Sequence, residues 1–346
     1  MSEVNAEAFC DLYEEPSNFV DRQTLVETIL NSNKNDQIIA AGTFVLLFVL
    51  KYLKYFFFLE LHKAYQDNLK PLEEIYRNFT YDQPIIDDAY FYSRPLILLI
   101  GQYSSGKSTF VKYLLEKDYP GIRIGPEPTT DKFIVVMHGK ESSIIPGNAL
   151  VIDQTKPFKD LMKFGNKFLN RFQASIVDAK ALQGITIIDT PGILTNNNNS
   201  DGYDYKGVIE WFAQRADRIF LFVDSNKLEL SGDFQQIGQM IRDYDDKLRI
   251  ILNKTDLVDE QELIRLYGAL MWFLGRTLDL KEVIQIYLGS FWGKVIKNNS
   301  KRKVYEFDEF RIFEDMSNLS KETLLRKANL LIKRSQELSI HIFLIQ

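Results

Sequence analysis

An apolar run that leads directly into a glycine-rich loop is the feature that most constrains the fold of this chain. Leu96 to Ile100 has the length of a buried strand, and Gly101-Gln-Tyr-Ser-Ser-Gly-Lys-Ser108 follows it with the spacing of a phosphate-binding loop. A helical segment begins near Lys107. Glycines let backbone N–H groups turn towards phosphate oxygens at the start of a helix, so this order predicts a nucleotide-binding α/β domain.

The residues of this loop have expected roles that follow from their chemistry. Lys107 can reach the terminal phosphates of a nucleotide, and the hydroxyl of Ser108 can ligate Mg²⁺. A chance glycine turn is the alternative, and the combination of strand, loop, Lys-Ser pair and helix argues against it. The predicted nucleotide-binding residues of the loop are Gly101, Gln102, Tyr103, Ser104, Ser105, Gly106, Lys107, Ser108 and Thr109.

From Leu96 onward, apolar segments of strand length alternate with helical segments, which is typical of a doubly wound, mainly parallel sheet. The predicted strands are 96–100, 132–137, 149–152, 185–188, 218–223, 248–252 and 283–288. The predicted helices include Lys107–Glu116, Phe158–Phe172, Tyr205–Arg215, Gly232–Asp243 and Glu260–Leu274. Ligands of such sheets bind at the carboxyl ends of the strands, so the motif residues should lie in loops that follow strands.

A second motif, Asp189-Thr-Pro-Gly192, follows the predicted strand 185–188. Its carboxylate can hold the Mg²⁺ shell through water, and the amide of Gly192 can sense a terminal phosphate. On its own this tetrapeptide is a plain turn, and its position after a buried strand is what makes it a candidate switch.

A third candidate lies between these motifs, in the proline-stiffened loop Gly125-Pro-Glu-Pro-Thr-Thr-Asp131. A threonine hydroxyl here can complete the Mg²⁺ shell, as a nucleotide-sensing switch loop requires. The chemistry does not distinguish Thr129 from Thr130. A rigid turn with exposed threonines is the alternative.

A fourth motif, Asn253-Lys-Thr-Asp256, ends the predicted strand 248–252. Asp256 can accept hydrogen bonds from the ring and exocyclic nitrogens of a purine, while Asn253 and Lys254 brace the loop. The bare motif favours guanine.

Composition excludes several classes of function. The net charge of −5 gives no global reason to expect a nucleic-acid partner. The single cysteine, Cys10, permits no internal disulfide and indicates a reducing compartment. The three histidines are scattered along the chain, which argues against a zinc site.

The segment 38–59 is intensely apolar but is interrupted by Lys51 and Lys54. A membrane-spanning helix needs about 20 apolar residues, and this segment reaches that length only by including both lysines. Three interpretations stay open: a membrane-inserted or interfacial helix, a spanning anchor, or a helix buried against another domain.

Several longer blocks resemble the Eps15-homology-domain-containing proteins, a family of dynamin-related ATPases that remodel endocytic membranes. The resemblance covers about residues 60 to 340. The blocks are Leu69-Lys-Pro-Leu-Glu-Glu-Ile-Tyr76, the phosphate-loop sequence, Gly125–Asp131, Val136-Met-His-Gly139, Pro146-Gly-Asn-Ala-Leu150, Phe164-Gly-Asn-Lys-Phe-Leu-Asn-Arg-Phe172, Tyr267-Gly-Ala-Leu-Met-Trp272 and Gly289-Ser-Phe-Trp292.

The resemblance implies ATP as the nucleotide, with slow hydrolysis, although the bare motif at Asn253 favours GTP. It also implies that Thr130 is the switch threonine and a Mg²⁺ ligand with Ser108, and that Asp189 and Gly192 form the second switch. No residue stands out as a general base, so catalysis by Lys107, Ser108, Thr130, Asp189 and Gly192 is expected to rest on positioning and charge stabilisation.

Trp272 lies in a segment, 266–274, that is apolar nearly all round. Such a helix must be covered on more than one side. An ordinary core tryptophan and an anchor of a dimer seam are both open from the residues. The resemblance favours a homodimer or oligomer through this face.

The family forms a stalk from both chain ends, and its tip contacts anionic membrane. Lys327, Lys333 and Arg334 are the candidate basic face here, with an ordinary solvated helix face as the alternative. Past Gln346 the family continues to a C-terminal peptide-binding domain, so we expect that domain to be absent and no Asn-Pro-Phe peptide partner.

The expected protein is a dynamin-like P-loop ATPase that is cytoplasmic and peripheral on endosomal or plasma membrane. A guanine-selective GTPase and a nucleotide-gated scaffold with little turnover are the alternatives. The expected parts are an acidic region (1–37), the apolar segment (38–59), a stalk helix with linker (60–94), the nucleotide-binding domain (95–293) and an incomplete C-terminal stalk (294–346).

Overall fold

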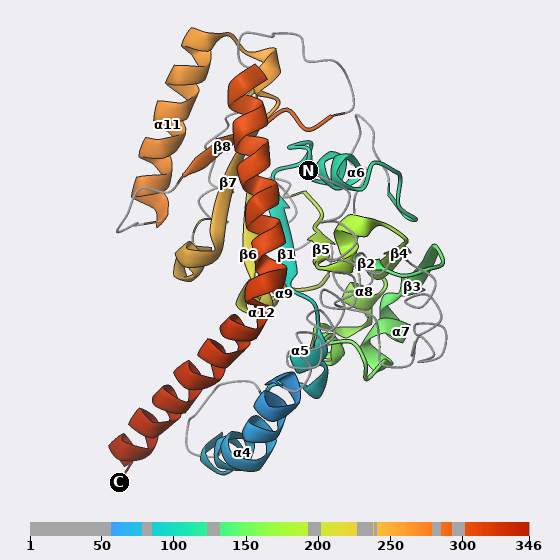
Figure 1. Ribbon diagram of the computed structural model, residues 1–346, viewed down its shortest axis with the longest axis vertical. Coiled ribbons are helices and arrows are strands. Elements are labelled where there is room, and N and C mark those ends of the chain that lie inside the picture. The colour runs from blue at the N-terminus through green and yellow to red at the C-terminus, as the bar shows by residue number, and fades with distance from the viewer. Residues whose placement is uncertain are drawn as a thin grey trace, which may run out of the picture. The chain divides into compact units, whose positions relative to one another are not determined.

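The computed structural model describes residues 57–77, 85–122, 132–192, 202–226, 238, 241–278, 285–292 and 302–345 (Figure 1). Several predicted features lie outside these residues: the acidic region, most of the apolar segment, the loop with Thr129 and Thr130, and nearly all of the helix expected at Gly232–Asp243. The chain divides into two compact units, Arg94–Ser320 and Met1–Ser93 with Lys321–Gln346. We call them the nucleotide unit and the helical unit.

The nucleotide unit is built on a sheet whose described strands follow the order β3-β4-β2-β5-β1-β6-β7-β8. Most neighbouring strands are parallel, while β2 with β5 and β3 with β4 are antiparallel. The predicted α/β class is therefore confirmed, with a mixed sheet. The strands are β1 (Leu96–Gly101), β2 (Phe133–His138), β3 (Ser143–Pro146), β4 (Phe172–Val177), β5 (Thr186–Asp189), β6 (Arg218–Asp224), β7 (Leu248–Asn253) and β8 (Ile286–Leu288).

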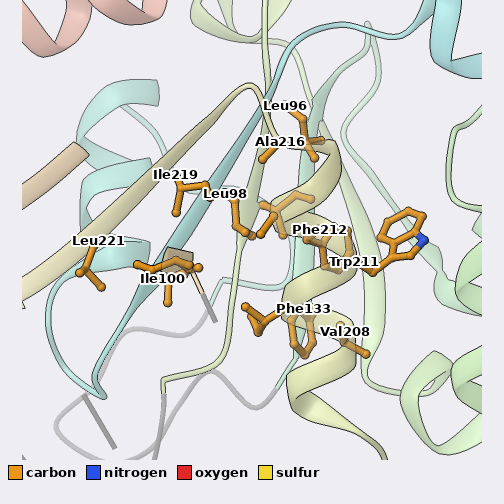
Figure 2. Close-up of a cluster of buried hydrophobic side chains, with 14 of the residues drawn as sticks. Leu96, Leu98, Ile100, Phe133, Val208, Trp211, Phe212, Ala216, Ile219 and Leu221 are labelled. Carbon is orange, nitrogen blue, oxygen red and sulfur yellow. The ribbon is translucent and has the colours of Figure 1, made fainter. Parts of the chain in front are cut away.

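Two hydrophobic clusters form the core of this unit, and alternate residues of β1 contribute to each. Leu96, Leu98 and Ile100 pack in the cluster that includes helix α9 (Tyr205–Arg215), as Figure 2 shows. Ile97 and Leu99 belong to the cluster that includes helix α6 (Lys107–Leu115). Burial on both faces explains why β1 is a continuous apolar run rather than an alternating one.

The region between β2 and β5 differs from the prediction. Residues 149–152, expected as a strand, belong to helix α7 (Gly147–Ile152). A Cβ on Gly147 would lie 2.4 Å from the carbonyl oxygen of Leu169, so only glycine allows this close approach of the helix start. Tertiary packing has overridden the strand preference of Val151 and Ile152.

The helix expected at Phe158–Phe172 is also wrong as a single element. It is a 3-10 helix (Lys159–Phe164) and a short helix α8 (Gly165–Leu169), and Phe172 already begins β4. Gly165 interrupts the helix with a φ of 77°, a left-handed conformation that glycine adopts without steric cost.

The helical unit contains a helical stretch at 57–64, a π-helical turn (Tyr65–Leu69), α4 (Lys70–Arg77), α5 (Asp88–Tyr92) and the end of α12 (Arg302–Ile345). Pro71 lies at the start of α4, and the helical stretch continues through it. Its ring has no N–H and crowds the carbonyl one turn earlier, and the chain accommodates it with the wider π turn. The Lys70 N–H accordingly donates to the Tyr65 carbonyl, five residues back.

The buried charges of the helical unit correct the expected basic face. Arg334 is 7% exposed, and its Nε donates to Glu73 Oε1 at 2.8 Å. Lys327 is 5% exposed, and its Nζ donates to the carbonyl oxygens of Phe91 and Ser93 at 2.9 and 2.8 Å. Both cations therefore form hydrogen bonds inside the helical unit. Of the three residues expected to form a basic face, only Lys333 is exposed.

The residues of helix α12 up to Ser320 group with the nucleotide unit, and those from Lys321 onward group with the helical unit. Asp315, for example, accepts hydrogen bonds from Arg218 of β6 at 3.0 to 3.3 Å. Within the described part of the chain, no helix is both long and apolar enough to cross a membrane.

Candidate functional site: a phosphate loop and a base loop at the carboxyl edge of the sheet

The phosphate loop follows β1, and its shape depends on two glycines. A Cβ on Gly101 would lie 2.4 Å from the Phe222 carbonyl oxygen of β6, so a larger residue cannot fit there. Gly106 has a φ of 97° and forms the N-cap of α6. Ser104 also takes a left-handed conformation, with a φ of 60°. The loop therefore curls at the N-terminus of α6, where N–H groups and the helix dipole favour phosphate.

Lys107 is held inside this curl. It is 6% exposed, and its Nζ donates to the carbonyl oxygens of Gly101 and Gln102, both at 3.0 Å. Burial lowers the pKa of Lys107 to about 8, while the nearby Asp189 carboxylate opposes that change. Since this pKa is above neutral pH, the side chain keeps its positive charge near the loop.

Ser108 and Asp189 lie side by side, although they are far apart in the sequence. Ser108 Oγ donates to Asp189 Oδ2 at 2.5 Å, and Tyr119 Oη donates to the same oxygen at 2.9 Å. Asp189 Oδ1 is buried and has no hydrogen-bond partner among the described residues. Burial raises the pKa of Asp189, and the hydrogen bond from Ser108 lowers it. A hydroxyl and a carboxylate oxygen lacking a donor fit the oxygen ligands that Mg²⁺ prefers.

Gly192 ends the second motif directly against the phosphate loop. A Cβ at this position would lie 2.5 Å from the Cα of Tyr103, so its peptide approaches the loop backbone closely. Thr190 anchors the motif, because its Oγ1 donates to the Leu99 carbonyl of β1 at 2.7 Å. The structure thus brings Lys107, Ser108, Asp189 and Gly192 together, while Thr130 lies outside the described residues.

The loop after β7, Asn253–Asp256, which we call the base loop, is hydrogen-bonded to the phosphate loop. Asn253 Nδ2 donates to the Ser105 carbonyl at 2.9 Å, and Lys254 Nζ donates to the Ser104 carbonyl at 2.6 Å. Asp256 is 5% exposed, and its Oδ1 accepts a hydrogen bond from Ser290 Oγ at 2.7 Å. Its Oδ2 is buried without a partner among the described residues, so this oxygen can accept a hydrogen bond from a base. Thr109 lies on α6 next to the loop and is half-buried.

Sequence reasoning missed three residues of this site. Asp224 forms an ion pair with Lys254, with 2.6 Å between Oδ2 and Nζ. Tyr119 donates a hydrogen bond to Asp189, and Ser290 donates one to Asp256. Asp224 ends β6 and Ser290 follows β8, so the rule that ligand residues follow parallel strands was a signal for both. For Tyr119 the sequence carried no signal.

Trp272 lies on α11 (Glu260–Leu278) and is 68% exposed. The buried positions of this helix are Leu270, Phe273, Leu274 and Leu278. The alternative of a core tryptophan is therefore wrong, because the described residues leave most of the indole exposed. The guanidinium of Arg276 lies 5.6 Å from the centre of the indole ring.

A mixed α/β sheet with a phosphate loop after β1, a carboxylate after β5 and a base loop after β7 defines a nucleotide-binding domain of the P-loop class. Residues 97–255 match the Dynamin family, which places the domain within the dynamin-related members of that class. The chain belongs to the family of EH domain-containing proteins. It is 48% identical over 287 residues to EH domain-containing protein 3 of Rattus norvegicus and 46% identical over 287 residues to EH domain-containing protein 1 of Bos taurus.

Each of these alignments covers 82% of this chain and 54% of the relative, so the chain spans about half the length of the curated relatives it matches. Among solved structures, a bacterial dynamin pair aligns over 96% of this chain and 56% of that chain, with 16% identity and a TM-score of 0.45. The family assignment rests on the sequence relatives, and it confirms the resemblance seen in the sequence blocks.

Proposed function

We propose that this protein is a dynamin-related ATPase that binds ATP with Mg²⁺, hydrolyses it slowly, and couples its nucleotide state to membrane remodelling in endocytic trafficking. The observation that carries the proposal is the meeting of Lys107, Ser108, Asp189 and the base loop at one edge of the sheet, in a chain that belongs to the family of EH domain-containing proteins. In the cell it is cytoplasmic and peripheral on endosomal or plasma membrane.

Each residue of the site has a task in this proposal. The N–H groups of the phosphate loop and Lys107 bind the phosphates, and Gly192 senses the terminal one. Ser108 and Thr130 would hold Mg²⁺, and the Asp189 carboxylate would support the site. When bound, Mg²⁺ would supply positive charge that offsets the charge of the phosphates. The described site contains no obvious general base, so the loop and switch backbone orient the attacking water.

The guanine-selective alternative is supported by one observation. Asp256 Oδ1 accepts a hydrogen bond from Ser290, and Oδ2 has no hydrogen-bond partner among the described residues. A carboxylate in this state suits the paired N–H donors of guanine. Adenine also offers an exocyclic amine to such an oxygen, so the carboxylate is compatible with both purines. Family membership is what favours ATP.

Calorimetry separates the two purines. We expect ATP to bind the full chain more tightly than GTP in the presence of Mg²⁺, and chelation of Mg²⁺ with EDTA to weaken ATP binding by at least about tenfold, because the ion offsets the phosphate charge. Tighter binding of GTP would overturn the choice of nucleotide. A lack of binding by either nucleotide would overturn the proposal as a whole.

The proposal includes assembly on anionic membranes through the exposed face of α11. Truncation of a tryptophan anchor typically costs at least ~2 kcal/mol, so Trp272→Ala should weaken dimerisation by roughly 30-fold in analytical ultracentrifugation. The variant should also show a smaller increase in ATP turnover when anionic vesicles are added. Co-sedimentation of the protein with the vesicles is measured in parallel. Ile152→Ala, on α7 and 72% exposed, is the matched control. Equal behaviour of the two variants would argue against this face.

A further inference from the structure

The segment Gly289–Phe291, directly after β8, holds three residues of the base loop. The Gly289 carbonyl accepts hydrogen bonds from Thr255 N and Oγ1, at 3.2 and 3.0 Å. Ser290 Oγ donates to Asp256 Oδ1 at 2.7 Å, and the Phe291 N–H donates to Asn253 Oδ1 at 3.3 Å. The position of the base loop therefore depends on the position of this short segment.

The ring of Phe291 fixes that segment to the helix of the phosphate loop. Phe291 is 3% exposed, and its ring packs edge-on against Phe110 and Tyr113 of α6, with centroids 5.0 and 5.7 Å apart. The ring also lies close to Gly289, where a Cβ would lie 2.2 Å from Cε2 of the ring. The ring thus contacts both the segment that carries Ser290 and the helix that begins at Lys107.

We infer that Phe291 is a positioning residue that determines how the protein discriminates between purine bases. It does so by fixing the Asp256 carboxylate at a set place relative to the phosphate loop. The inference rests on the proposed nucleotide-binding function and adds to it a residue that does not touch the nucleotide.

The physical reason is that hydrogen-bond strength falls steeply with misalignment. Phosphates bound in the loop after β1 limit where the base of the same nucleotide can lie. If the Gly289–Phe291 segment shifts, Ser290 and Asp256 move with it, and the contacts to the base lose their alignment. Lys107 bonds within its own loop. The link from this segment to the phosphate loop runs through Asn253, which the backbone N–H of Phe291 holds, and Phe291→Leu keeps that N–H.

The test is Phe291→Leu in the full chain, with Mg²⁺ and three ligands: ATP, GTP and inorganic tripolyphosphate. The preferred nucleotide should bind about tenfold more weakly, the change that ~1.4 kcal/mol of lost base contacts produces. The ratio of ATP to GTP affinity should move towards one. Tripolyphosphate, which has no base, should bind within about twofold of the unmodified protein.

Two further variants keep the inference falsifiable. Phe168→Leu removes a fully buried aromatic ring in the other hydrophobic cluster, so it should lower stability without changing the affinity ratio. Tyr113→Leu removes the contact to Phe291 from the α6 side at a half-buried position, and it should shift the ratio in the same direction by less.

The outcomes separate this inference from the proposed function. An unchanged affinity ratio in Phe291→Leu, or an equal change in Phe168→Leu, would overturn the role of Phe291 alone. Equal weakening of tripolyphosphate would also overturn it, because the phosphate loop itself would then be disturbed. Absence of nucleotide binding by the unmodified chain would overturn the proposed function, and this role with it.

Discussion

Lys107→Ala should remove measurable nucleotide binding. The ammonium group is the charged donor of the phosphate loop, and charge-assisted bonds to phosphate are among the strong hydrogen bonds of proteins. Loss of about 3 kcal/mol or more corresponds to at least roughly a hundredfold in Kd. The same loss is expected for ATP and GTP, because the residue acts on the phosphates and not on the base. Calorimetry with each nucleotide in Mg²⁺ measures it.

Lys112→Ala is the matched control for this variant. Lys112 lies on the same helix, its side chain is 47% exposed, and it pairs with Asp118 at 2.7 Å. Its truncation removes a lysine from α6 without touching the loop, so affinity should stay unchanged. If Lys107→Ala folds and still binds either nucleotide within about threefold of the unmodified protein, the loop does not hold the triphosphate in the expected way.

Arg334→Met should destabilise the helical unit by about 3–5 kcal/mol, because it leaves a buried carboxylate without its cation. Glu73 is 1% exposed and accepts hydrogen bonds from Arg334 Nε and from Tyr65 Oη, at 2.8 and 2.9 Å. Tyr65 Oη in turn accepts from the Ile86 N–H at 2.9 Å, so the carboxylate organises contacts between separate segments. Hydrogen exchange of α4 and of the end of α12 is the measurement that localises the loss.

Lys333→Met provides the control, because this neighbour is exposed and should change stability by less than about 0.5 kcal/mol. The double variant Glu73→Gln/Arg334→Met removes both charges and should recover much of the loss. If the double variant is as unstable as Arg334→Met, the cost is lost packing of the arginine stem rather than an unpaired charge.

The sequence was most informative where a motif and a fully buried strand coincide. β1 is a continuous apolar run, and the bodies of β6 and β7 are apolar apart from Arg218 and Arg249. Each of these strands ends in a residue of the site: Gly101, Asp224 and Asn253. The spacing of the loop specified its curl at Gly106 and the place of Lys107. The contacts between the loops were predictable in kind, since the carboxyl ends of parallel strands share one edge.

The strands β3 and β4 could not be predicted, for physical reasons. β3 is a short, mostly exposed edge strand, so it shows no apolar pattern. β4 carries Gln173 and Ser175 at buried positions, which hides it among polar segments. The burial of Arg334 and Lys327 could not be predicted from the sequence either, because their hydrogen-bond partners are more than 200 residues away along the chain.

The antiparallel pairing of β2 with β5 has a consequence for chain polarity. A strand that ran parallel to β5 would begin at the edge opposite to the nucleotide site. β2 runs the other way, and its register pairs Ile134 with Asp189, so Phe133 enters the sheet at the phosphate edge. Because of this reversal, it is the first residues of β2, and not its last, that lie at the edge where β5 ends. The start of β2 and the end of β5 therefore lie at the same edge of the sheet.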